Sequence, residues 1–591
     1  MAEQGTKSST DDPIEDDANR EKQESAEPYA GQSANDENYP KATELILITF
    51  ALCLSVFCVA LDNTIIATAI PRITDQFNSI NDIGWYGSAY LLTTCSFQLF
   101  YGKLYTLFPI KWVYLVGLVI FEIGSAVCGA APNSPALIVG RAVAGLGSAG
   151  IFSGSILIIS NSVPLRQRPS YLGLIMAMYG IASVAGPLMG GAFTDKVSWR
   201  WCFYINLPIG GLTFVFIVFL YHPTNQAKVK GFTGSTWYAR VAEFDVFGTT
   251  FFIPAIVCLL LALQWGGSTY AWSSGRIIAL LVIFGVFLIT FVGIQLWRQD
   301  SAMVPPRILK QRSVAAAAWF GFMLSGSFFV MLYELPIWFQ ATKGASAVKS
   351  GIMNLPVILS LVIISLLAGG LVAKLGFYTP FAIASAVLTA IGAGLISTFN
   401  VTTNHSHWIG YQVIFGLGVG LGLQQTLVAV QTVLPPADIA IGTAIIMFSQ
   451  TFGGALSISI AQNVFTNKLV RNTIAAAVPG LNVTDVLRTG ATELKTTIPS
   501  QYLGIVQVAY NGAIVDAYYV AVALAALSIF GAVCLEWKSV NGAQEGDGVC
   551  VKRCCQGHRG VSDYEGISLV RKIPRWAERA WSLFVGIIEA G

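Results

Sequence analysis

The sequence contains few charged residues. Asp, Glu, Lys and Arg make up 11% of the 591 residues, whereas hydrophobic residues make up 54%. A water-soluble domain carries roughly 25% charged residues, so this chain lacks the polar surface that a soluble protein of its length requires. The composition excludes a soluble globular protein and predicts one embedded in lipid. The net charge of +3 gives no reason to expect nucleic acid as a partner.

The sequence also lacks the motifs of catalysis and metal binding. Its four histidines all lie outside the long apolar runs, and it has no phosphate-binding glycine loop, nucleophile elbow or zinc-protease helix. Ten cysteines are scattered without the paired spacing of zinc sites, and we interpret most of them as small core residues. We therefore expect no enzyme, no catalytic residue, no metal and no cofactor.

Long apolar runs fill most of the chain. A bilayer core about 30 Å thick requires ~20 apolar residues per helix, and a helix satisfies its own backbone hydrogen bonds in lipid. Fourteen such runs predict an all-α integral membrane protein with fourteen transmembrane helices. The runs are 45–70, 84–103, 112–131, 135–160, 171–193, 202–221, 246–265, 276–297, 314–338, 351–373, 380–399, 408–434, 441–465 and 514–536.

The runs divide into two sets of six with two between them. Residues 102–104 after the second run match residues 369–371 after the tenth in the positions of Gly and Leu, as expected for a transporter built from repeats. We predict two pseudo-symmetric six-helix bundles with two inserted helices. The predicted parts are a tail 1–43, a bundle 44–221, a loop 222–245, the inserted helices 246–297, a loop 298–313, a bundle 314–537 with a long outer loop 466–513, and a tail 538–591.

Both tails are predicted to be cytoplasmic. An even number of spans places them on one side, and basic residues are about twice as frequent in the short segments of that side. The first tail has eleven acidic residues, four basic residues and no apolar run, so we expect disorder and no cleavable signal peptide. The second ends with the spacing of an amphipathic helix. Glycosylation sequons in predicted outer loops begin at Asn400, Asn404 and Asn482.

A string of small residues lies inside the fifth run. Gly180, Gly186, Pro187, Gly190 and Gly191 allow a neighbouring helix to approach closely, and the proline removes one backbone hydrogen bond. The string resembles the antiporter motif of the major facilitator superfamily. The resemblance implies a dry, close-packed hinge between the two halves.

Three further strings are similar to motifs of that superfamily. Arg141 with Gly145 and Gly147 resembles its basic motif, and residues 61–65 resemble its first-helix motif. Residues 199–210 resemble a string typical of the fourteen-span drug:proton antiporter branch. Overall the chain most resembles the fungal toxin and multidrug efflux transporters.

One loop departs from the pattern of the superfamily. Gly102, Leu104 and Lys111 match its gating loop, but Thr106 stands where many members have Asp. That Asp is thought to latch the inner gate through charge contacts. The resemblance therefore implies that the latch of this chain is weaker or is built from other residues.

Few ionisable residues lie inside the apolar runs. Each raises the free energy of insertion into the membrane unless it pairs with an opposite charge or contacts water. Asp62 is the leading candidate for a proton carrier in a water-accessible cavity, and Arg141 is the fixed charge that would bind it when deprotonated. Structural roles are the alternatives: a cap or brace for Asp62 and a helix–helix bond for Arg141. Glu122, in the third run, is interpreted as a protonated packing residue.

Uncharged polar and aromatic residues gather in the later runs. They are candidates to line a cavity for amphipathic organic molecules, although ordinary contacts between helices also explain them. Glu334 joins this set, with solvation at the membrane interface as its alternative explanation. The candidates are Gln424, Gln425, Gln431, Phe448, Gln450, Phe452 and Glu334.

These observations predict a proton-coupled antiporter that exports an amphipathic organic compound by alternating access. Its expected partners are the organic substrate, protons and the lipid bilayer, and we expect a monomer. The expected location is the plasma membrane, with the vacuolar membrane as the alternative. Two other functions stay open: uptake, for instance of an iron–siderophore complex, and a membrane sensor or scaffold without transport.

Overall fold

The computed structural model describes residues 39–79, 82–222, 243–267, 270–475 and 500–541. The N-terminal tail, most of the loop 222–245 and nearly all of the C-terminal tail lie outside these residues, as does the predicted amphipathic helix. From Lys41 onward the chain forms one compact unit, which is all-helical in the described residues apart from two isolated β-bridges.

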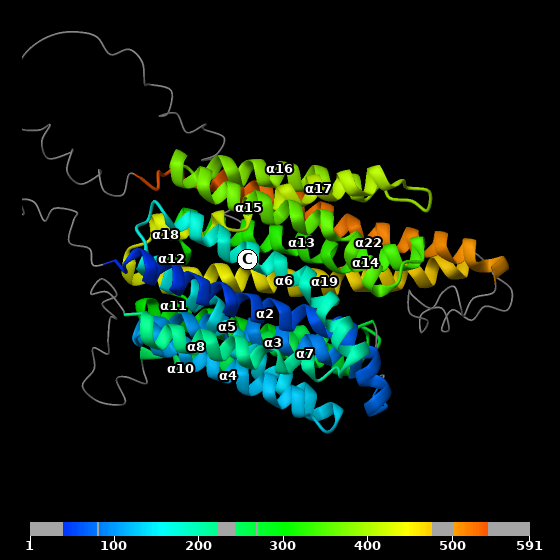
Figure 1. Cartoon of the computed structure of the whole chain (residues 1–591), viewed down its shortest axis with the longest axis horizontal. Helices are drawn as coiled ribbons and strands as arrows, with labels where there is room; N and C mark the ends of the chain where they lie inside the picture. The colour runs from blue at the N-terminus through cyan, green and yellow to red at the C-terminus, as the bar shows by residue number, and fades with distance from the viewer. Residues whose placement is uncertain (1–38, 80–81, 223–242, 268–269, 476–499, 542–591) are drawn as a thin grey trace, which may run out of the picture. The chain divides into compact units, whose positions relative to one another are not determined.

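Fourteen long helical segments of the described residues match the predicted spans (Figure 1). Thirteen segments are long and apolar enough to cross a membrane by length and composition. The fourteenth, α3, is 25 residues long but contains more polar side chains. The segments are α2 (Ala42–Phe77), α3 (Ile83–Leu107), α4 (Ile110–Ala130), α5 (Ser134–Ser162), α6 (Arg168–Lys196), α7 (Trp201–Tyr204) with α8 (Asn206–Leu220), α10 (Val246–Trp265), α11 (Gly275–Arg298), α13 (Arg312–Lys343), α15 (Leu355–Leu375), α16 (Thr379–Ile396), α17 (His405–Gly422) with α18 (Gln425–Val433), α19 (Ile439–Ala475) and α22 (Ser500–Cys534).

Two halves pack largely within themselves. In the first, α2 packs on α6 and α8, and α5 packs on α3 and α4. In the second, α13 packs on α19 and α22, and α17 packs on α15 and α16. The buried apolar side chains of α2–α8 form two core clusters, and most of a third and larger cluster comes from α13–α22. The halves meet where α6 contacts α15 and where α3 contacts α19.

The repeated glycines lie at these two meeting points. A Cβ added to Gly102 of α3 would collide with the side chain of Ala444 on α19. A Cβ added to Gly369 of α15 would lie 2.5 Å from the carbonyl oxygen of Pro169 on α6. Equivalent positions of the two halves therefore serve the same purpose, because only glycine lets the two helices approach this closely.

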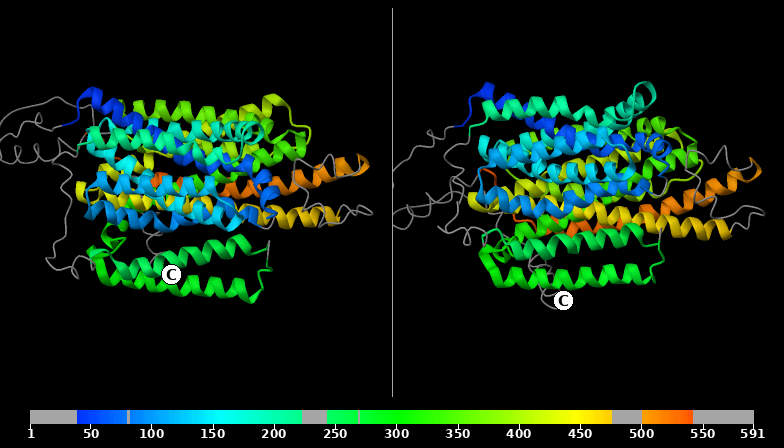
Figure 2. Two further views of the ribbon diagram at one scale, coloured as in Figure 1. Left: turned by 60° about the horizontal axis from the view of Figure 1, so that its bottom comes forward. Right: turned by 90° about the horizontal axis from the view of Figure 1, so that it is seen from below.

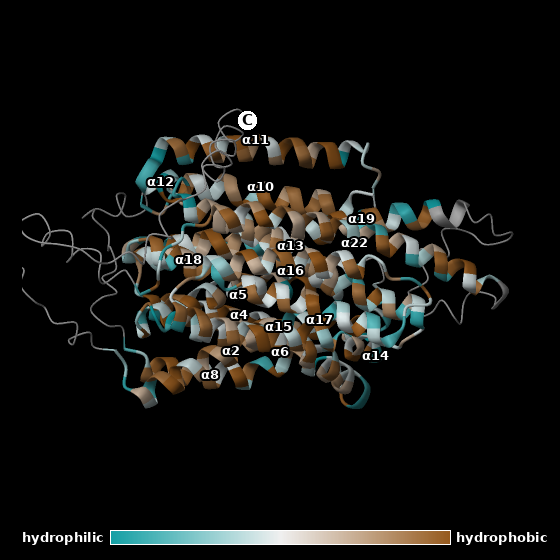
Figure 3. Cartoon of the chain, turned by 90° about the horizontal axis from the view of Figure 1, so that it is seen from above, coloured by the Kyte–Doolittle hydropathy of each residue, from teal (hydrophilic) through white to brown (hydrophobic). Residues whose placement is uncertain are grey.

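The inserted helices α10 and α11 pack against each other (Figure 2) and lie where the two halves meet. Helix α10 contacts α3 and α19, whereas α11 leaves large apolar side chains such as Ile289 and Trp297 exposed. Hydrophobic residues run along α11, and hydrophilic residues gather near α12 (Pro306–Leu309) and the far end of α19 (Figure 3). Exposed apolar surface of this kind is expected of a helix that faces lipid.

Two sequence-based expectations about loops change. The outer loop 466–513 is too long, because α19 continues to Ala475 and α22 begins at Ser500. The gating loop is only a short turn, since Gly102 and Leu104 belong to α3 and Lys111 belongs to α4. The Lys111 ammonium donates to the carbonyl oxygens of Val218 (2.7 Å) and Tyr221 (2.8 Å) at the end of α8.

Two of the three sequons fall in the described residues. Asn400 and Asn404 are exposed in the turn between α16 and α17, at the end of the helices opposite to the start of α2 (Figure 1). Asn482 lies outside the described residues. The exposure is compatible with glycosylation, which stays a prediction.

Candidate functional site

Asp62 of α2 and Arg141 of α5 form a buried ion pair. Both side chains have no exposed surface, and NH1 of Arg141 donates to the Asp62 carboxylate. The same nitrogen donates to the Asp62 backbone oxygen at 3.2 Å, and Nε donates to the Tyr86 carbonyl at 2.8 Å. The guanidinium thereby ties together α2, α3 and α5, as expected of a charge that cannot reach solvent.

Neighbouring side chains complete the surroundings of the pair. Asn206 of α8 donates to Asp62 Oδ1 and to Ser125 Oγ, both at 3.1 Å. The Tyr90 ring lies 4.5 Å from the guanidinium carbon of Arg141, a cation–π arrangement. Five helices of the first half, α2, α3, α4, α5 and α8, thus supply this cluster, which holds one negative and one positive charge.

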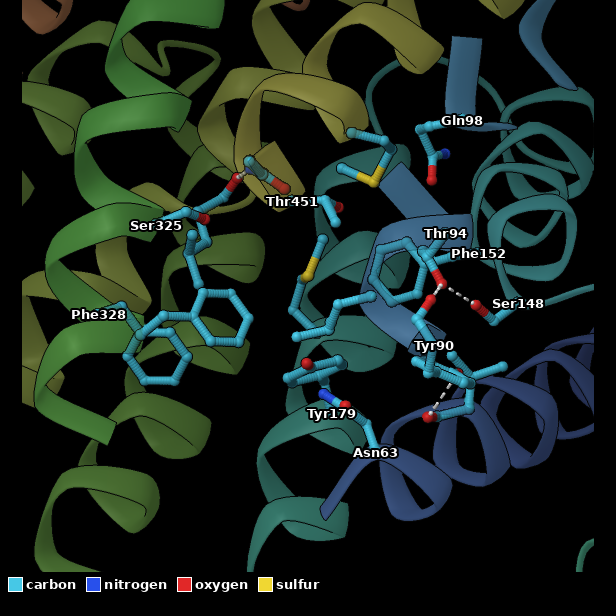
Figure 4. Close-up of a pocket in the computed structure, with 17 residues that line it drawn as sticks. Asn63, Tyr90, Thr94, Gln98, Ser148, Phe152, Tyr179, Ser325, Phe328 and Thr451 are labelled. Carbon is cyan, nitrogen blue, oxygen red and sulfur yellow. Dashed lines mark hydrogen bonds between the residues drawn. The ribbon is translucent and has the colours of Figure 1, made fainter. Parts of the chain in front are cut away.

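A cavity lies between the two halves (Figure 4). Helices α2, α3, α5 and α6 line it from the first half, and residues of α13, of α19 and of the α17–α18 junction line it from the second. Its empty space amounts to about 780 Å³, a figure that includes space open to solvent. Its 17 lining residues are Val59, Asn63, Tyr90, Leu91, Thr94, Gln98, Ser148, Phe152, Met176, Tyr179, Ser325, Phe328, Phe329, Leu423, Met447, Gln450 and Thr451.

The wall of the cavity is apolar with scattered hydroxyl and amide groups. Phe152, Phe328 and Phe329 supply aromatic surface, and Asn63 and Gln450 supply amides. None of the 17 lining residues is Asp, Glu, Lys, Arg or His. The arrangement can bind an uncharged molecule through apolar contacts and a few hydrogen bonds.

A layer of lining residues separates the ion pair from the cavity. Asp62 and Arg141 are not among the lining residues, which corrects the expectation of a carboxylate that faces water. Two lining residues connect the cavity with the pair: Asn63, which follows Asp62 in the chain, and Tyr90, whose ring packs on Arg141. A change of charge at the pair can therefore reach the cavity through direct packing.

Most of the polar candidates from the later runs lie outside the cavity wall. Gln450 is the one of the seven that lines the cavity. The Gln424 amide instead donates to the Ser365 carbonyl of α15, and the Gln425 amide donates to the Leu421 carbonyl of α17, both at 3.0 Å. Phe448 and Phe452 stack on each other with ring centres 5.3 Å apart. These contacts match the alternative of ordinary packing between helices.

The two candidate glutamates of the apolar runs take no part in the ion pair; Glu334 is buried, and Glu122 is partly buried. Glu334 is 3% exposed, and its Oε2 atom has no hydrogen-bond partner within the described part of the chain. The Glu122 carboxylate lies over Gly210 of α8, also without a hydrogen-bond partner among the described residues. Neither glutamate lines the cavity.

The small residues of α6 allow close approach on two sides. A Cβ on Gly186 or Gly190 would collide with side chains of α2, and one on Gly180 would lie 2.6 Å from Val362 of α15. Pro187 lies inside the helix. Helix α6 therefore packs closely against both halves, as the string predicts, whereas its role as a hinge stays a prediction.

The lining residues that sequence reasoning missed include a polar stripe on α3. Tyr90, Thr94 and Gln98 recur every fourth residue and so share one face of the helix. A polar stripe at this spacing in an otherwise apolar helix is a signal that the sequence contained. Within the described residues, no group of three or more His, Cys, Asp or Glu side chains could hold a metal ion.

Residues 52–458 match the Major Facilitator Superfamily. The chain is 61% identical over 506 residues to the MFS-type efflux pump MFS1 of Arthroderma benhamiae, covering 85% of this chain and 94% of the relative. It is 53% identical to the efflux pump roqT of Penicillium rubens, covering 84% and 91%. It is 52% identical to the efflux pump aflT of Aspergillus parasiticus, covering 86% and 99%.

Solved structures of the superfamily share the fold. The proton:xylose symporter XylE matches with a TM-score of 0.53 at 14% identity, covering 82% of this chain and 94% of that one. The human organic anion transporter MFSD10 matches with a TM-score of 0.52 at 12% identity, covering 81% and 100%. Sequence and structure together define a multi-pass membrane transporter.

The chain belongs to the major facilitator superfamily. The prediction that the chain is a transporter of this superfamily, similar to fungal efflux pumps, is confirmed. The family comprises transporters of small molecules, which disfavours the alternative of a sensor or scaffold.

Proposed function

We propose that this protein exports uncharged amphipathic organic compounds, such as toxins or secondary metabolites, in exchange for protons. The observation that carries the proposal is the cavity between the halves, whose 17 lining residues include aromatic rings, hydroxyls and amides but no acid or base. An ion that enters such a cavity loses its hydration without gaining a counter-charge, which is costly. A neutral aromatic molecule pays no such cost.

Proton coupling is assigned to Asp62 with Arg141 as its partner. Protonation of Asp62 removes one charge of the pair and weakens its hold on Arg141. Arg141 stays cationic and then favours a different arrangement of α3 and α5, both of which line the cavity. Cargo and proton thereby bias the same equilibrium through their different affinities for its two states.

The direction of transport is proposed from the relatives, and the orientation of the protein in the membrane is proposed from the distribution of basic residues. The relatives named as efflux pumps support export, and the basic segments support cytoplasmic tails. The plasma membrane is the proposed location, with glycans on Asn400 and Asn404 at the outer face. The monomer contains both halves of the cavity and is the proposed functional unit.

Metabolite profiling of a producing strain with and without the gene tests this function. Export predicts that the deletion strain retains compounds that the wild type secretes, and that these compounds are neutral and amphipathic at the pH of the cytosol. Retention of permanently charged compounds would contradict the proposed cargo, and depletion of a nutrient inside the cell would indicate uptake. In liposomes, a pH gradient should then drive the purified protein to move a retained compound in the direction opposite to the proton flow.

A further inference from the structure

The segment between α11 and α13 connects the two halves at one end of the molecule. We call residues 299–311 the strap; it contains a 3-10 turn (Gln299–Ser301) and the short helix α12. The strap lies at the end where α2 begins and α22 ends, called the tail end below (Figures 1 and 2). Its apolar side chains Ala302, Met303 and Ile308 are buried, so it is packed against the protein.

The first half holds the strap through Lys103. The Lys103 ammonium, near the tail end of α3, donates to the carbonyl oxygens of Ser301 (3.1 Å) and Ala302 (3.2 Å). The lysine side chain is 6% exposed. A buried ammonium that binds two carbonyls fixes the strap to α3, because withdrawing it would leave the charge without its partners.

The second half holds the strap through Asp438. Arg307 of α12 binds the Asp438 carboxylate with NH1 at 2.6 Å and NH2 at 2.9 Å. Asp438 immediately precedes α19 and is 2% exposed. The two parallel hydrogen bonds fix the orientation of the guanidinium on the carboxylate. Asp438 and Asp300 raise the pKa of Arg307 above its ordinary range, so its charge is permanent.

The inserted helices hold the strap rigid between these contacts. Asp245, just before α10, is fully buried and accepts from the Met303 amide (2.7 Å) and from Gln295 of α11 (2.8 Å). Gln295 accepts in turn from the Val304 amide at 2.8 Å. The strap therefore bridges α3 and α19 as a fixed piece, at the end where Gly102 already brings these helices into contact.

We propose that the strap is the latch of the tail-end gate and that its release point is the Arg307–Asp438 pair. The inference rests on alternating access, as in the proposed function. For cargo to enter at the tail end, α3 and α19 must separate. Because the strap is rigid, its contact with one of these two helices must then break. Arg307 is 47% exposed, whereas the contacts of Lys103 and Asp245 are buried, so water reaches Arg307 first. This assigns a role to the two inserted helices as the support of the latch.

Distance measurements on the whole protein test the latch without any cargo. Trp112 of α4 and Leu375 of α15 are exposed and lie at the tail ends of opposite halves. Each is replaced by p-acetylphenylalanine, a nitroxide label is attached to the new side chain, and the distance between the two labels is measured. Arg307→Gln should raise the ratio of long to short distances about fivefold, the effect of losing a partly exposed ion pair. Asp300→Asn is the matched control: it removes the exposed partner of the same guanidinium within the strap and should leave the ratio unchanged.

Each outcome decides a separate question. A distribution in Arg307→Gln identical to that of the wild type would overturn the latch. The exchanged pair Arg307→Asp with Asp438→Arg should restore the wild-type ratio, which separates the ion pair from general damage to the fold. If the wild type shows one unchanged distance at every pH from 5 to 8, both without cargo and with a compound that the deletion strain retains, alternating access itself fails, and the proposed function fails with it.

Discussion

The Tyr90 ring packs on the Arg141 guanidinium at 4.5 Å while the same residue lines the cavity. One side chain therefore contacts both the buried charge and the space that would hold cargo. Its hydroxyl donates to the Val59 carbonyl of α2 at 3.2 Å, which fixes the ring in place. Tyr90 therefore joins the two parts of the site by direct side-chain contact.

Substitution of Tyr90 should uncouple protons from cargo. Tyr90→Leu removes the aromatic face next to Arg141, which is worth about 2 kcal/mol when desolvated, so pH-driven transport in liposomes should fall about tenfold or more. Tyr90→Phe keeps the ring and should retain most of the transport. Equal losses in both variants would show that the hydroxyl, and not the cation–π contact, is the feature that matters.

Breaking the ion pair from one side should destabilise the protein. Arg141→Met leaves the Asp62 carboxylate buried without its cation, which costs about 3–5 kcal/mol, and the apparent melting temperature in detergent should fall. Asp62→Leu combined with Arg141→Met removes both charges and should recover much of the stability. Neither variant should support pH-driven transport. A double variant as unstable as the single one would contradict the ion pair as the cause.

The number and approximate positions of the helices could be predicted from sequence because each span of the bilayer requires about 20 consecutive apolar residues. Errors arose where helices leave the membrane. Hydropathy falls at the interface, but α19 and α22 continue past it, and Lys468 of α19 lies 3.2 Å from Asp516 of α22. Contacts of this kind stabilise polar helix ends that an apolar run cannot reveal.

The buried charges of the site were predictable, whereas the cavity wall was not. Asp62 and Arg141 stand out because a charge within an apolar run must find a partner. Hydroxyl and amide side chains carry no such requirement, since a helix carbonyl satisfies them, as Ser365 does for Gln424. Which of them faces the cavity depends on the rotation of each helix, and that is fixed by packing between distant parts of the chain.

Neighbouring glycines of α6 should differ sharply in their tolerance of a methyl group. Gly190→Ala places a Cβ against Ile65 and Thr68 of α2, and overpacking of this kind costs about 1–3 kcal/mol. The Cβ of Gly191→Ala would meet Val348 at an ordinary 3.6 Å. The first variant should therefore lose stability and transport, and the second should resemble the wild type. Thermal unfolding and liposome flux measure both, and equal tolerance would exclude a tight contact of α6 with α2.

Exchange of a neutral cargo for protons must move charge across the membrane. Each proton that enters while an uncharged molecule leaves carries one positive charge, so a membrane potential should drive transport even without a pH gradient. A K⁺ diffusion potential of about 60 mV, negative on the side that receives protons, should raise the cargo concentration ratio about tenfold for one proton, because 100 mV is worth ~2.3 kcal/mol per charge. Valinomycin with equal K⁺ on both sides is the control. If cargo left as a monovalent cation, exchange for one proton would be electroneutral and the ratio would not respond, which would contradict the uncharged cavity as the basis of selectivity.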